Sequence, residues 1–312
     1  MSQRYQIRFG GYGPPSTSFS RALKRIGDDI EAKFGRDVDI KYIYNIMDLG
    51  FKGKDILWLT ENGFLTISYQ SSSYLTDRVP ELGFVDLPFL FADNTTARAA
   101  IDGSLGLYLT QKTEDRFNYK ILGYFENGFR QISNNLRPIY SPNDLKNMKI
   151  RVMLSDTHVR TFELLGAIPK RLDLTEAISG IKDGSLDAQE NPLTNTVTYD
   201  VHKHHKHHTI SNHFYVSRSI MCNRTAYYSW PEDLKNELRN AAQKAIKWQR
   251  KQADKDVEDA NKKIRAEGHK IIELSAKQIE KFREKIRPQY EEARNLYGNE
   301  LFDILNFTYS KS

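Results

Sequence analysis

The first forty or so residues alternate between strand-like and helix-like hydrophobic patterns. Apolar side chains fall on every second position over 5–9, as in a half-buried strand, and a loop rich in glycine and proline follows over 10–15. Over 19–34 the apolar residues recur at helical spacing, and over 38–42 they alternate again. A strand, a helix and a second strand of these lengths predict a βαβ unit and therefore an α/β fold.

Two later segments have the same pattern of a helix, a tight turn and a strand. The first has a predicted helix over 57–61 and a strand over 64–68, joined by Asn-Gly. The second has a helix over 175–182 and a strand over 185–188, joined by Asp-Gly. Glycine after Asn or Asp suits a left-handed helix stop. The repetition predicts two lobes of similar construction.

The segments between and after these repeats predict how the lobes are joined. Strands are predicted over 120–125, 129–133 and 148–152, with a turn at 126–128 separating the first two. A helical stripe without proline then runs over about 232–266, which at 1.5 Å per residue would reach about 50 Å. We expect this helix to lie along both lobes. The alternative is a terminal coiled coil, but the stripe is rich in alanine and has no sustained leucine heptads.

Length and composition limit the classes of protein to consider. The 312 residues correspond to about two domains, and 39% hydrophobic with 28% charged residues is typical of a globular protein. No run approaches the roughly 18 apolar residues of a membrane-spanning helix, and no leader is recognised before the first strand. The net charge of +6 arises from 46 basic and 40 acidic residues that are interspersed. A nucleic-acid binder is therefore the weaker interpretation of the basic pI.

Cysteine and histidine offer little evidence of a metal or cofactor. Cys222 is the single cysteine, so an internal disulfide and a CxxC site are excluded, and its apolar neighbours predict a buried, inert thiol. Residues 202–208 contain five histidines that could chelate a divalent metal. Interleaved lysines and the lack of carboxylates favour instead a solvated, partly helical surface segment. We expect no metal and no cofactor.

No pattern in the chain nominates a catalytic residue. The glycine-rich loop at 10–13 lacks the spacing of a phosphate-binding motif and is interpreted as a turn. No nucleophile elbow, zinc-protease motif or paired carboxylates stand out. An enzyme acting on a small carboxylic acid in a cleft between the lobes is kept as the alternative to a binding protein.

Three side chains close or follow predicted strands: Arg130, Arg151 and Asn191. Strand ends at the crevice of an α/β lobe are where ligands bind, so these side chains are expected to face a shared cleft. A guanidinium can hold both oxygens of a carboxylate, and an amide adds a donor or an acceptor. The three form a candidate anion clamp, although an arginine at a strand end can equally be an exposed ion-pair partner.

Four segments carry a resemblance to a known family: 82–91 (LGFVDLPFLF), 149–152 (KIRV), 166–169 (GAIP) and 187–192 (DAQENP). In this order and spacing, the chain resembles the solute-binding proteins of TRAP transporters, of the dicarboxylate-binding type, over nearly its whole length. The resemblance implies a two-lobed α/β fold like that of periplasmic binding proteins, with a long helix spanning both lobes. One lobe would comprise 1–128 plus about 216–253, and the other 129–215 plus about 254–312.

The resemblance also implies a function and a site. The protein would capture a small organic acid and deliver it to a membrane permease driven by a sodium gradient, in the periplasm, after removal of a leader. Arg151 matches the family's principal carboxylate-binding arginine, Arg130 its second arginine and Asn191 its site asparagine. The further expected ligand contacts are Tyr12, Gln70, Ser71, Ser72, Ser73, Phe214 and Tyr215.

Overall fold

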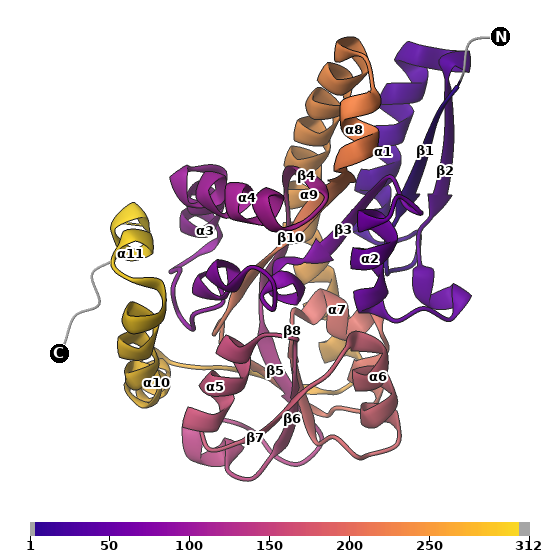
Figure 1. The fold of residues 1–312 in the computed structure, drawn as a ribbon. Coiled ribbons are helices and arrows are strands. Elements are labelled where there is room, and N and C mark those ends of the chain that lie inside the picture. Colours follow the sequence, from indigo (N-terminus) through magenta and orange to yellow (C-terminus); the bar gives the residue numbers. More distant parts are fainter. Residues whose placement is uncertain (1–3, 306–312) are drawn as a thin grey trace. The chain divides into compact units, whose positions relative to one another are not determined.

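Two units, each built around its own sheet, divide the chain. A computed structural model describes residues 4–305 (Figure 1). One unit comprises 1–72, 110–127 and 217–256, and the other comprises 73–109, 128–216 and 257–312. Residues 1–3 and 306–312 lie outside the described residues. The chain therefore passes between the units five times.

The first unit begins with the predicted βαβ arrangement. Its elements are β1 (Tyr5–Gly10), α1 (Ser18–Phe34), β2 (Val38–Ile43), α2 (Ile56–Glu61) and β3 (Ile67–Ser71). The three strands are parallel, and β1 lies between β2 and β3. Ile7 and Phe9 on β1 are buried, while their neighbour Arg8 is only partly so, which is the alternation seen in the sequence.

The second unit repeats this succession. Its elements are β6 (Lys149–Val152), α5 (Asp156–Leu164), β7 (Ile168–Arg171), α6 (Leu174–Lys182) and β8 (Ala188–Asn191). The strands are again parallel, and β6 lies between β7 and β8, as β1 lies between β2 and β3. Right-handed crossovers in opposite directions place α5 and α6 on opposite faces of this sheet (Figure 1). The predicted similarity of the two units is confirmed.

Each parallel trio is flanked by an antiparallel strand. The further strands are β4 (Tyr119–Phe129), β5 (Gln131–Asn134), β9 (His207–Ile210), β10 (Tyr215–Asn223) and β11 (Lys270–Glu273). β10 pairs with β3, and β5 pairs with β8. The complete sheet orders are β2-β1-β3-β10-β4 and β11-β9-β5-β8-β6-β7.

The long helix is present where the sequence predicts it. The remaining helices are α3 (Asn94–Asp102), α4 (Ser104–Arg116), α7 (Leu193–Thr198), α8 (Arg224–Ser229), α9 (Glu232–Ala266), α10 (Ala276–Tyr297) and α11 (Glu300–Leu305). α9 has 35 residues, of which 232–256 belong to the first unit and 257–266 to the second. Its buried stripe of leucine and alanine packs within the protein, so the coiled-coil alternative is wrong. No helix among residues 4–305 has the length and apolarity to cross a membrane.

Both predicted strands after the glycine turns begin three residues too early. β3 starts at Ile67 and β8 at Ala188, because the residues after each glycine first fold back onto their own helix. The backbone N–H of Leu65 donates to the carbonyl of Leu59 at 3.0 Å, and that of Leu186 to the carbonyl of Gly180 at 2.9 Å. Only after these bonds does the chain become free to pair with a strand.

The predicted turn at 126–128 is also wrong, because β4 runs through it without a break. Glu126 exchanges two backbone-to-side-chain hydrogen bonds with Gln249, each 2.9 Å long, which replace ladder bonds at this position. Gly128 has φ +87°, a conformation that glycine adopts without strain. The break between β4 and β5 falls instead at Arg130.

Residues 73–109 group with the second unit, whereas the resemblance assigns all of 1–128 to the first lobe. Their contacts explain this. The Tyr290 hydroxyl donates to the carbonyl of Pro88 at 2.7 Å, and the Thr157 hydroxyl to that of Gly83 at 3.1 Å. The rings of Phe84 and Phe302 pack edge to face at 4.9 Å.

Burial confirms one expectation about titratable side chains and overturns another. Cys222 is buried, and burial raises the pKa of its thiol well above the usual range. The histidine segment is not a solvated surface helix, because His202, His205 and His208 are fully buried. Val201, at the start of this segment, packs on Ile181, so the segment is held in the core.

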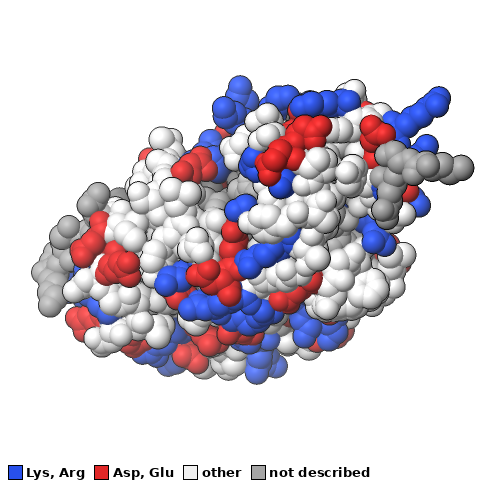
Figure 2. All heavy atoms as spheres, turned by 45° about the horizontal axis from the view of Figure 1, so that its top comes forward, with Lys and Arg blue, Asp and Glu red and all other residues white. Residues whose placement is uncertain are grey.

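On the surface, basic and acidic side chains intermingle over the face seen in Figure 2.

Replacement of Gly184 tests the left-handed turn that precedes β8. Gly184 has φ +78° and a Cβ there would touch nothing within 4 Å, so only backbone strain opposes a side chain. Gly184→Ala is expected to lower the free energy of unfolding by about 1 kcal/mol, measured by urea denaturation. Gly184→Asn is the control and should cost less, because asparagine tolerates this region. Equal losses in the two variants would contradict the strain argument.

Candidate functional site

Strand register brings Arg130, Arg151 and Asn191 to one edge of the second sheet. Arg151 on β6 lies beside Gln189 of β8, and Asn191 is the last residue of β8. β5 runs antiparallel to β8 with Gln131 opposite Asn191, so Arg130, just before β5, lies at the same edge. This edge holds the carboxyl ends of the parallel strands, where α/β folds bind ligands.

Arg151 is buried without a carboxylate partner. Its side chain is 1% exposed. The Nε donates to the carbonyl of Leu172 and the Nη2 to the hydroxyl of Tyr74, each at 3.0 Å. No carboxylate among residues 4–305 forms an ion pair with this guanidinium, and its Nη1 makes no hydrogen bond to them. The positive charge is therefore held only by neutral groups.

Arg130 has the opposite environment. It is fully buried and forms an ion pair with Glu190, which is also fully buried. Its Nη2 donates to Glu190 Oε1 at 3.0 Å and to the Glu190 carbonyl at 2.6 Å. The Nη1 is buried and unpartnered. Arg130 thus keeps one free donor although its charge is neutralised.

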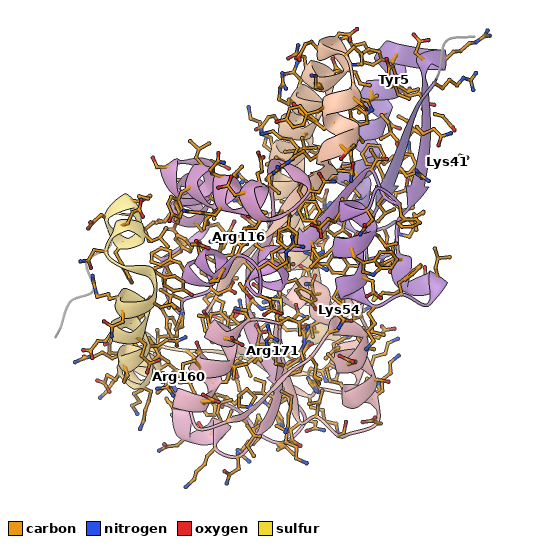
Figure 3. All side chains as sticks on the ribbon, in the orientation of Figure 1. Tyr5, Lys41, Lys54, Arg116, Arg160 and Arg171 are labelled. Carbon is orange, nitrogen blue, oxygen red and sulfur yellow. The ribbon has the colours of Figure 1, made fainter. Side chains whose placement is uncertain are left out.

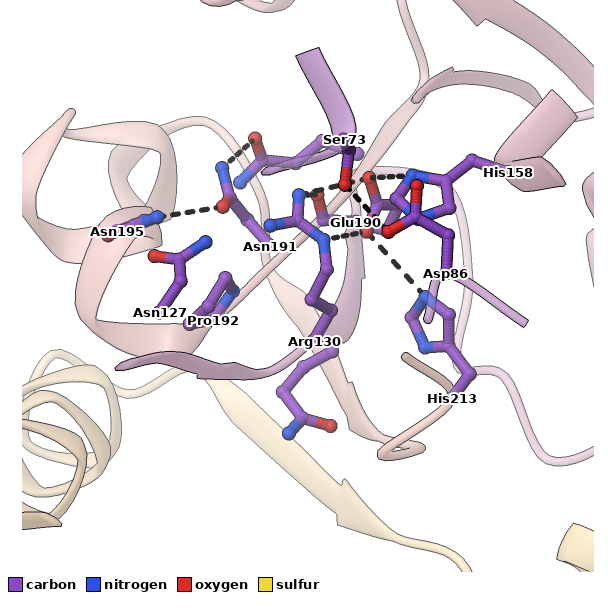
Figure 4. A network of polar contacts seen from close by, with 12 residues as sticks. Ser73, Asp86, Asn127, Arg130, His158, Glu190, Asn191, Pro192, Asn195 and His213 are labelled. Carbon is purple, nitrogen blue, oxygen red and sulfur yellow. Dashed lines mark hydrogen bonds and ion pairs between the residues drawn. The ribbon is translucent and has the colours of Figure 1, made fainter. Parts of the chain in front are cut away.

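Glu190 is surrounded by further titratable side chains (Figure 4). His213 Nε2 lies 3.7 Å and His158 Nδ1 4.0 Å from its carboxylate oxygens. Burial raises the pKa of Glu190, but the charge of Arg130 and its neighbours His213 and His158 lower it more, so the pKa lies well below its usual range. Glu190 is therefore ionised over the physiological pH range.

The same network extends to Asp86 and Ser73. The Ser73 hydroxyl donates to Asp86 Oδ1 at 2.7 Å, and His158 Nε2 lies 3.6 Å from the same oxygen. The His158 ring stacks on Phe214, with centroids 4.0 Å apart and planes 14° apart. Ser73 (Figure 4) and Phe214, both expected to contact the ligand, are thus tied to the network around Glu190.

Asn191 and Tyr215 complete the expected set in this unit. The Asn191 Oδ1 accepts from Asn195 at 3.0 Å, and its amide nitrogen donates to Gln189 at 3.4 Å. Tyr215 packs edge to face between Phe91 and Phe129. Both are buried.

The first-unit candidates Gln70, Ser71 and Ser72 are buried at the carboxyl end of β3. The Gln70 amide donates to the carbonyl of Gly53 at 2.8 Å and accepts from the Ser71 N–H at 2.7 Å, so one amide hydrogen and the amide oxygen are engaged within the protein. The Ser72 hydroxyl lies 3.0 Å from that of Ser217 and 3.1 Å from that of Ser219.

Tyr12 takes part in an aromatic box around an arginine that sequence reasoning missed. The Arg218 guanidinium lies 4.8 Å from the Tyr12 ring centroid and 3.8 Å from that of Phe19. Its Nη2 donates to Asn127 at 2.9 Å. Arg218 on β10 is paired in register with Ser71, as Gln131 is with Asn191 in the second sheet. Its position between two serines of a strand was the available signal.

Tyr74, Glu190 and His158 also went unassigned as site residues. Glu190 could have been found, because a carboxylate within a buried strand must have a cationic partner. Tyr74 and His158 left no such signal, since their roles depend on tertiary contacts. No group of three or more metal-ligating side chains suited to a metal occurs among residues 4–305.

Comparison with known proteins finds the same resemblance across the chain. Residues 9–295 match the model of the bacterial extracellular solute-binding proteins, family 7. The C4-dicarboxylate-binding protein DctB of Bacillus subtilis is 26% identical over 95% of this chain and 84% of its own length.

Two solved structures are similar over nearly the whole fold. The sugar acid binding protein of Advenella mimigardefordensis in complex with galactonate is 27% identical, with a TM-score of 0.92 over 98% of each chain. A TRAP periplasmic solute-binding protein of Sulfurospirillum deleyianum with bound succinate is 26% identical, with a TM-score of 0.91 over 98% of this chain and 100% of that one.

Replacement of Glu190 tests whether it neutralises Arg130. Glu190→Gln keeps the shape but leaves a buried, uncompensated guanidinium, so the free energy of unfolding of the ligand-free protein should fall by about 3–5 kcal/mol at pH 7.5. The double variant Arg130→Met, Glu190→Gln removes both charges and should recover most of this loss. Urea denaturation measures both, and a loss below about 1 kcal/mol in the single variant would contradict the pairing.

Proposed function

Because the chain belongs to family 7 of the bacterial extracellular solute-binding proteins, we propose that it captures a small organic acid by placing the acid's carboxylate on Arg151. The family match covers residues 9–295, so the function of the whole chain is solute binding for a TRAP transporter. The family and the structural neighbours are binding proteins for acids, which favours a binding protein over the alternative of an enzyme.

The observation that carries the proposal is the missing counter-ion of Arg151. Burying a guanidinium without an anion is unfavourable, since neutral hydrogen bonds replace only part of its hydration. Leu172 and Tyr74 occupy Nε and Nη2 and fix the plane of the guanidinium, which leaves Nη1 for a ligand. A ligand carboxylate on Nη1 supplies the absent negative charge and forms a charge-assisted hydrogen bond.

Arg130 and Asn191 are proposed as second contacts. The free Nη1 of Arg130 is a buried donor at the same sheet edge as Arg151, so it can bind the second carboxylate oxygen or an adjacent hydroxyl or keto group. Asn191 has its Oδ1 engaged by Asn195 and one amide hydrogen donated to Gln189, which leaves its second amide hydrogen for a ligand. Ser73, Phe214 and Tyr215 are proposed to shape the remainder of the contacts in this unit, and Tyr12, Gln70, Ser71 and Ser72 remain candidate contacts from the first unit.

The charge balance among Arg130, Glu190 and Arg151 favours a ligand with one carboxylate. Glu190 neutralises Arg130, whereas Arg151 has no partner, so the two arginines together leave one unbalanced positive charge. A monocarboxylate bearing hydroxyl or keto groups matches one charge and several neutral polar contacts. A dicarboxylate would place its second negative charge near Glu190.

The relatives are named for acids of both kinds. One solved structure holds galactonate and another succinate, and the Bacillus subtilis relative is named for C4-dicarboxylates. The charge balance of this chain supports the sugar-acid type. Proteins of this family act outside the cytoplasm with a membrane permease, and we propose the periplasm as the location and the permease subunits of a TRAP transporter as the partner.

A thermal-shift screen with matched acids tests the ligand class. At about a hundred times its dissociation constant a ligand adds about 2.7 kcal/mol of stability, which for a chain of this size raises Tm by several degrees. Galactonate and related sugar monocarboxylates are expected to raise Tm, and galactose, which lacks the carboxylate, is expected not to. A larger shift with succinate than with any monocarboxylate would overturn the charge argument, while no shift with any acid would count against the proposed site.

Substitution of Arg151 tests its role directly. Arg151→Met is expected to weaken binding of the best acid by several kcal/mol in isothermal titration calorimetry, because a desolvated charge pair is lost. Ligand-free stability should be retained, because the uncompensated charge is removed as well. Arg160→Ala is the control, since Arg160 on α5 pairs at the surface with Glu292 (Figure 3). Unchanged affinity in Arg151→Met would refute its role.

A further inference from the structure

All eight histidines of the chain lie in the second unit, and the structure collects most of them around one turn. We call residues 201–208 the histidine turn. Within it His202, His205 and His208 are fully buried, whereas His204 is exposed. Such a concentration of buried imidazoles has no part in the proposed grip on a carboxylate.

His205 and His208 are buried with neutral partners only. His205 Nδ1 lies 2.9 Å from the Ser133 hydroxyl on β5, and His208 Nε2 donates to the carbonyl of His205 at 3.0 Å. The remaining nitrogen of each ring, His205 Nε2 and His208 Nδ1, is buried and unpartnered. No carboxylate among residues 4–305 lies within ion-pair distance of either ring.

The charged and titratable groups around the turn do not provide His205 or His208 with a negative partner. His202 Nε2 lies 3.3 Å from Glu267, which can compensate a charge on His202 but reaches neither of the other two rings. The His208 ring lies 5.9 Å from that of His269. The other groups that face the turn are Asp200, Lys203, His204, Lys206, His207, Lys263 and Lys270. Basic and imidazole groups predominate, and they disfavour a further positive charge.

Burial therefore keeps both rings neutral. Desolvation, with the neighbouring histidines, lowers the pKa of His205 to about 3 and that of His208 to about 4. Once exposed to water, each ring would regain a pKa of about 6.5. A conformation in which the turn is open thus binds protons that the closed one excludes, so acid favours the open form.

The position of the turn determines what such opening releases. β9 begins within it, at His207, and β9 is the strand that holds β11 at the edge of the sheet. On its other side β9 pairs with β5 through Ile132, Ser133 and Asn134. β5 begins one residue after Arg130.

We propose that the histidine turn is an acid-sensitive latch, which holds β9 and β11 on the sheet of the second unit near neutral pH and releases them in mild acid. The sign follows from linkage. Stability of the closed form is complete above about pH 6.5 and declines as pH falls towards the lowered values of His205 and His208. Any effect on binding through Arg130 rests on the proposed function, but the latch itself does not.

The magnitude is large enough to measure. Between pH 7.5 and 5.0 a histidine that can protonate only in the open form shifts the open-to-closed ratio about thirtyfold, and two shift it close to a thousandfold.

Hydrogen–deuterium exchange of the ligand-free protein, corrected for the intrinsic pH dependence of exchange, tests the latch. Amides of β9 and β11 are expected to lose protection by about two to three orders of magnitude between pH 7.5 and 5.0, and those of β5 should follow in part. The β1–β2 pair serves as an internal control, because the first unit contains no histidine and should keep its protection.

Two variants separate the latch from general acid sensitivity. His205→Asn with His208→Gln retains hydrogen-bonding groups close to Nδ1 and Nε2 but cannot be protonated, so the acid-dependent loss at β9 and β11 should disappear. His204→Asn removes an exposed histidine from the same turn and should leave that loss intact.

Equal losses in both units, or no loss at β9 and β11 in the wild-type protein, would overturn the latch. These measurements use no ligand, so their outcome is independent of whether Arg151 binds an acid. The wild-type comparison of the two units also decides the question if the double variant fails to fold.

Discussion

A buried guanidinium without a carboxylate partner is the interaction on which the site depends. Arg151 is fixed by a backbone carbonyl and a tyrosine hydroxyl, neither of which carries a full negative charge. Placing a charge in such surroundings is unfavourable, and Arg151 lies near the end of β6, which pairs with β7 on one side and with β8 on the other. An anionic ligand is then the component that completes the electrostatics of this edge, which is why affinity and selectivity for a carboxylate follow from one residue.

Arg130 shows how the same residue type serves a different purpose at the same edge of the sheet, just before β5. Glu190 neutralises it, and His213 and His158 surround the pair, so its contribution to a ligand is a directed hydrogen bond rather than net charge. The two arginines reach this edge along strands that run in opposite directions. β6 runs parallel to β8 and brings Arg151 to the carboxyl end of the sheet, whereas β5 runs antiparallel and brings the residue before its first position to the same end. Two chain directions thus deliver two arginines to one edge.

The repeated helix, glycine turn and strand could be predicted from the sequence, because periodicity and a left-handed glycine are local properties. The arginines at strand ends were identifiable for the same reason, although their final roles were not. The predictions that were wrong concern features that depend on contacts between residues far apart in the chain. The β4 strand continues through Glu126 because Gln249, far along the chain, supplies its hydrogen bonds, and the histidine segment is buried because Val201 packs on Ile181. Neither contact can be recognised from the sequence next to the residues involved, so the local patterns predicted a turn and a solvated surface.

The two units share the order of their parallel strands, but all histidines lie in the second unit. Within the second sheet, the histidine turn and Arg151 lie on different strands. In the order β11-β9-β5-β8-β6-β7, the histidine turn lies at the β11-β9 side and Arg151 lies on β6, with the Arg130–Glu190 pair between them at β5 and β8. Glu190 stays ionised well below neutral pH, so the pair resists acid although one neighbouring strand does not. Arg151, anchored to β6 and to the residues after β7, does not depend on β9. The charge that attracts a carboxylate and the imidazoles that respond to protons are therefore carried by separate strands of one sheet, and each can change without removing the other.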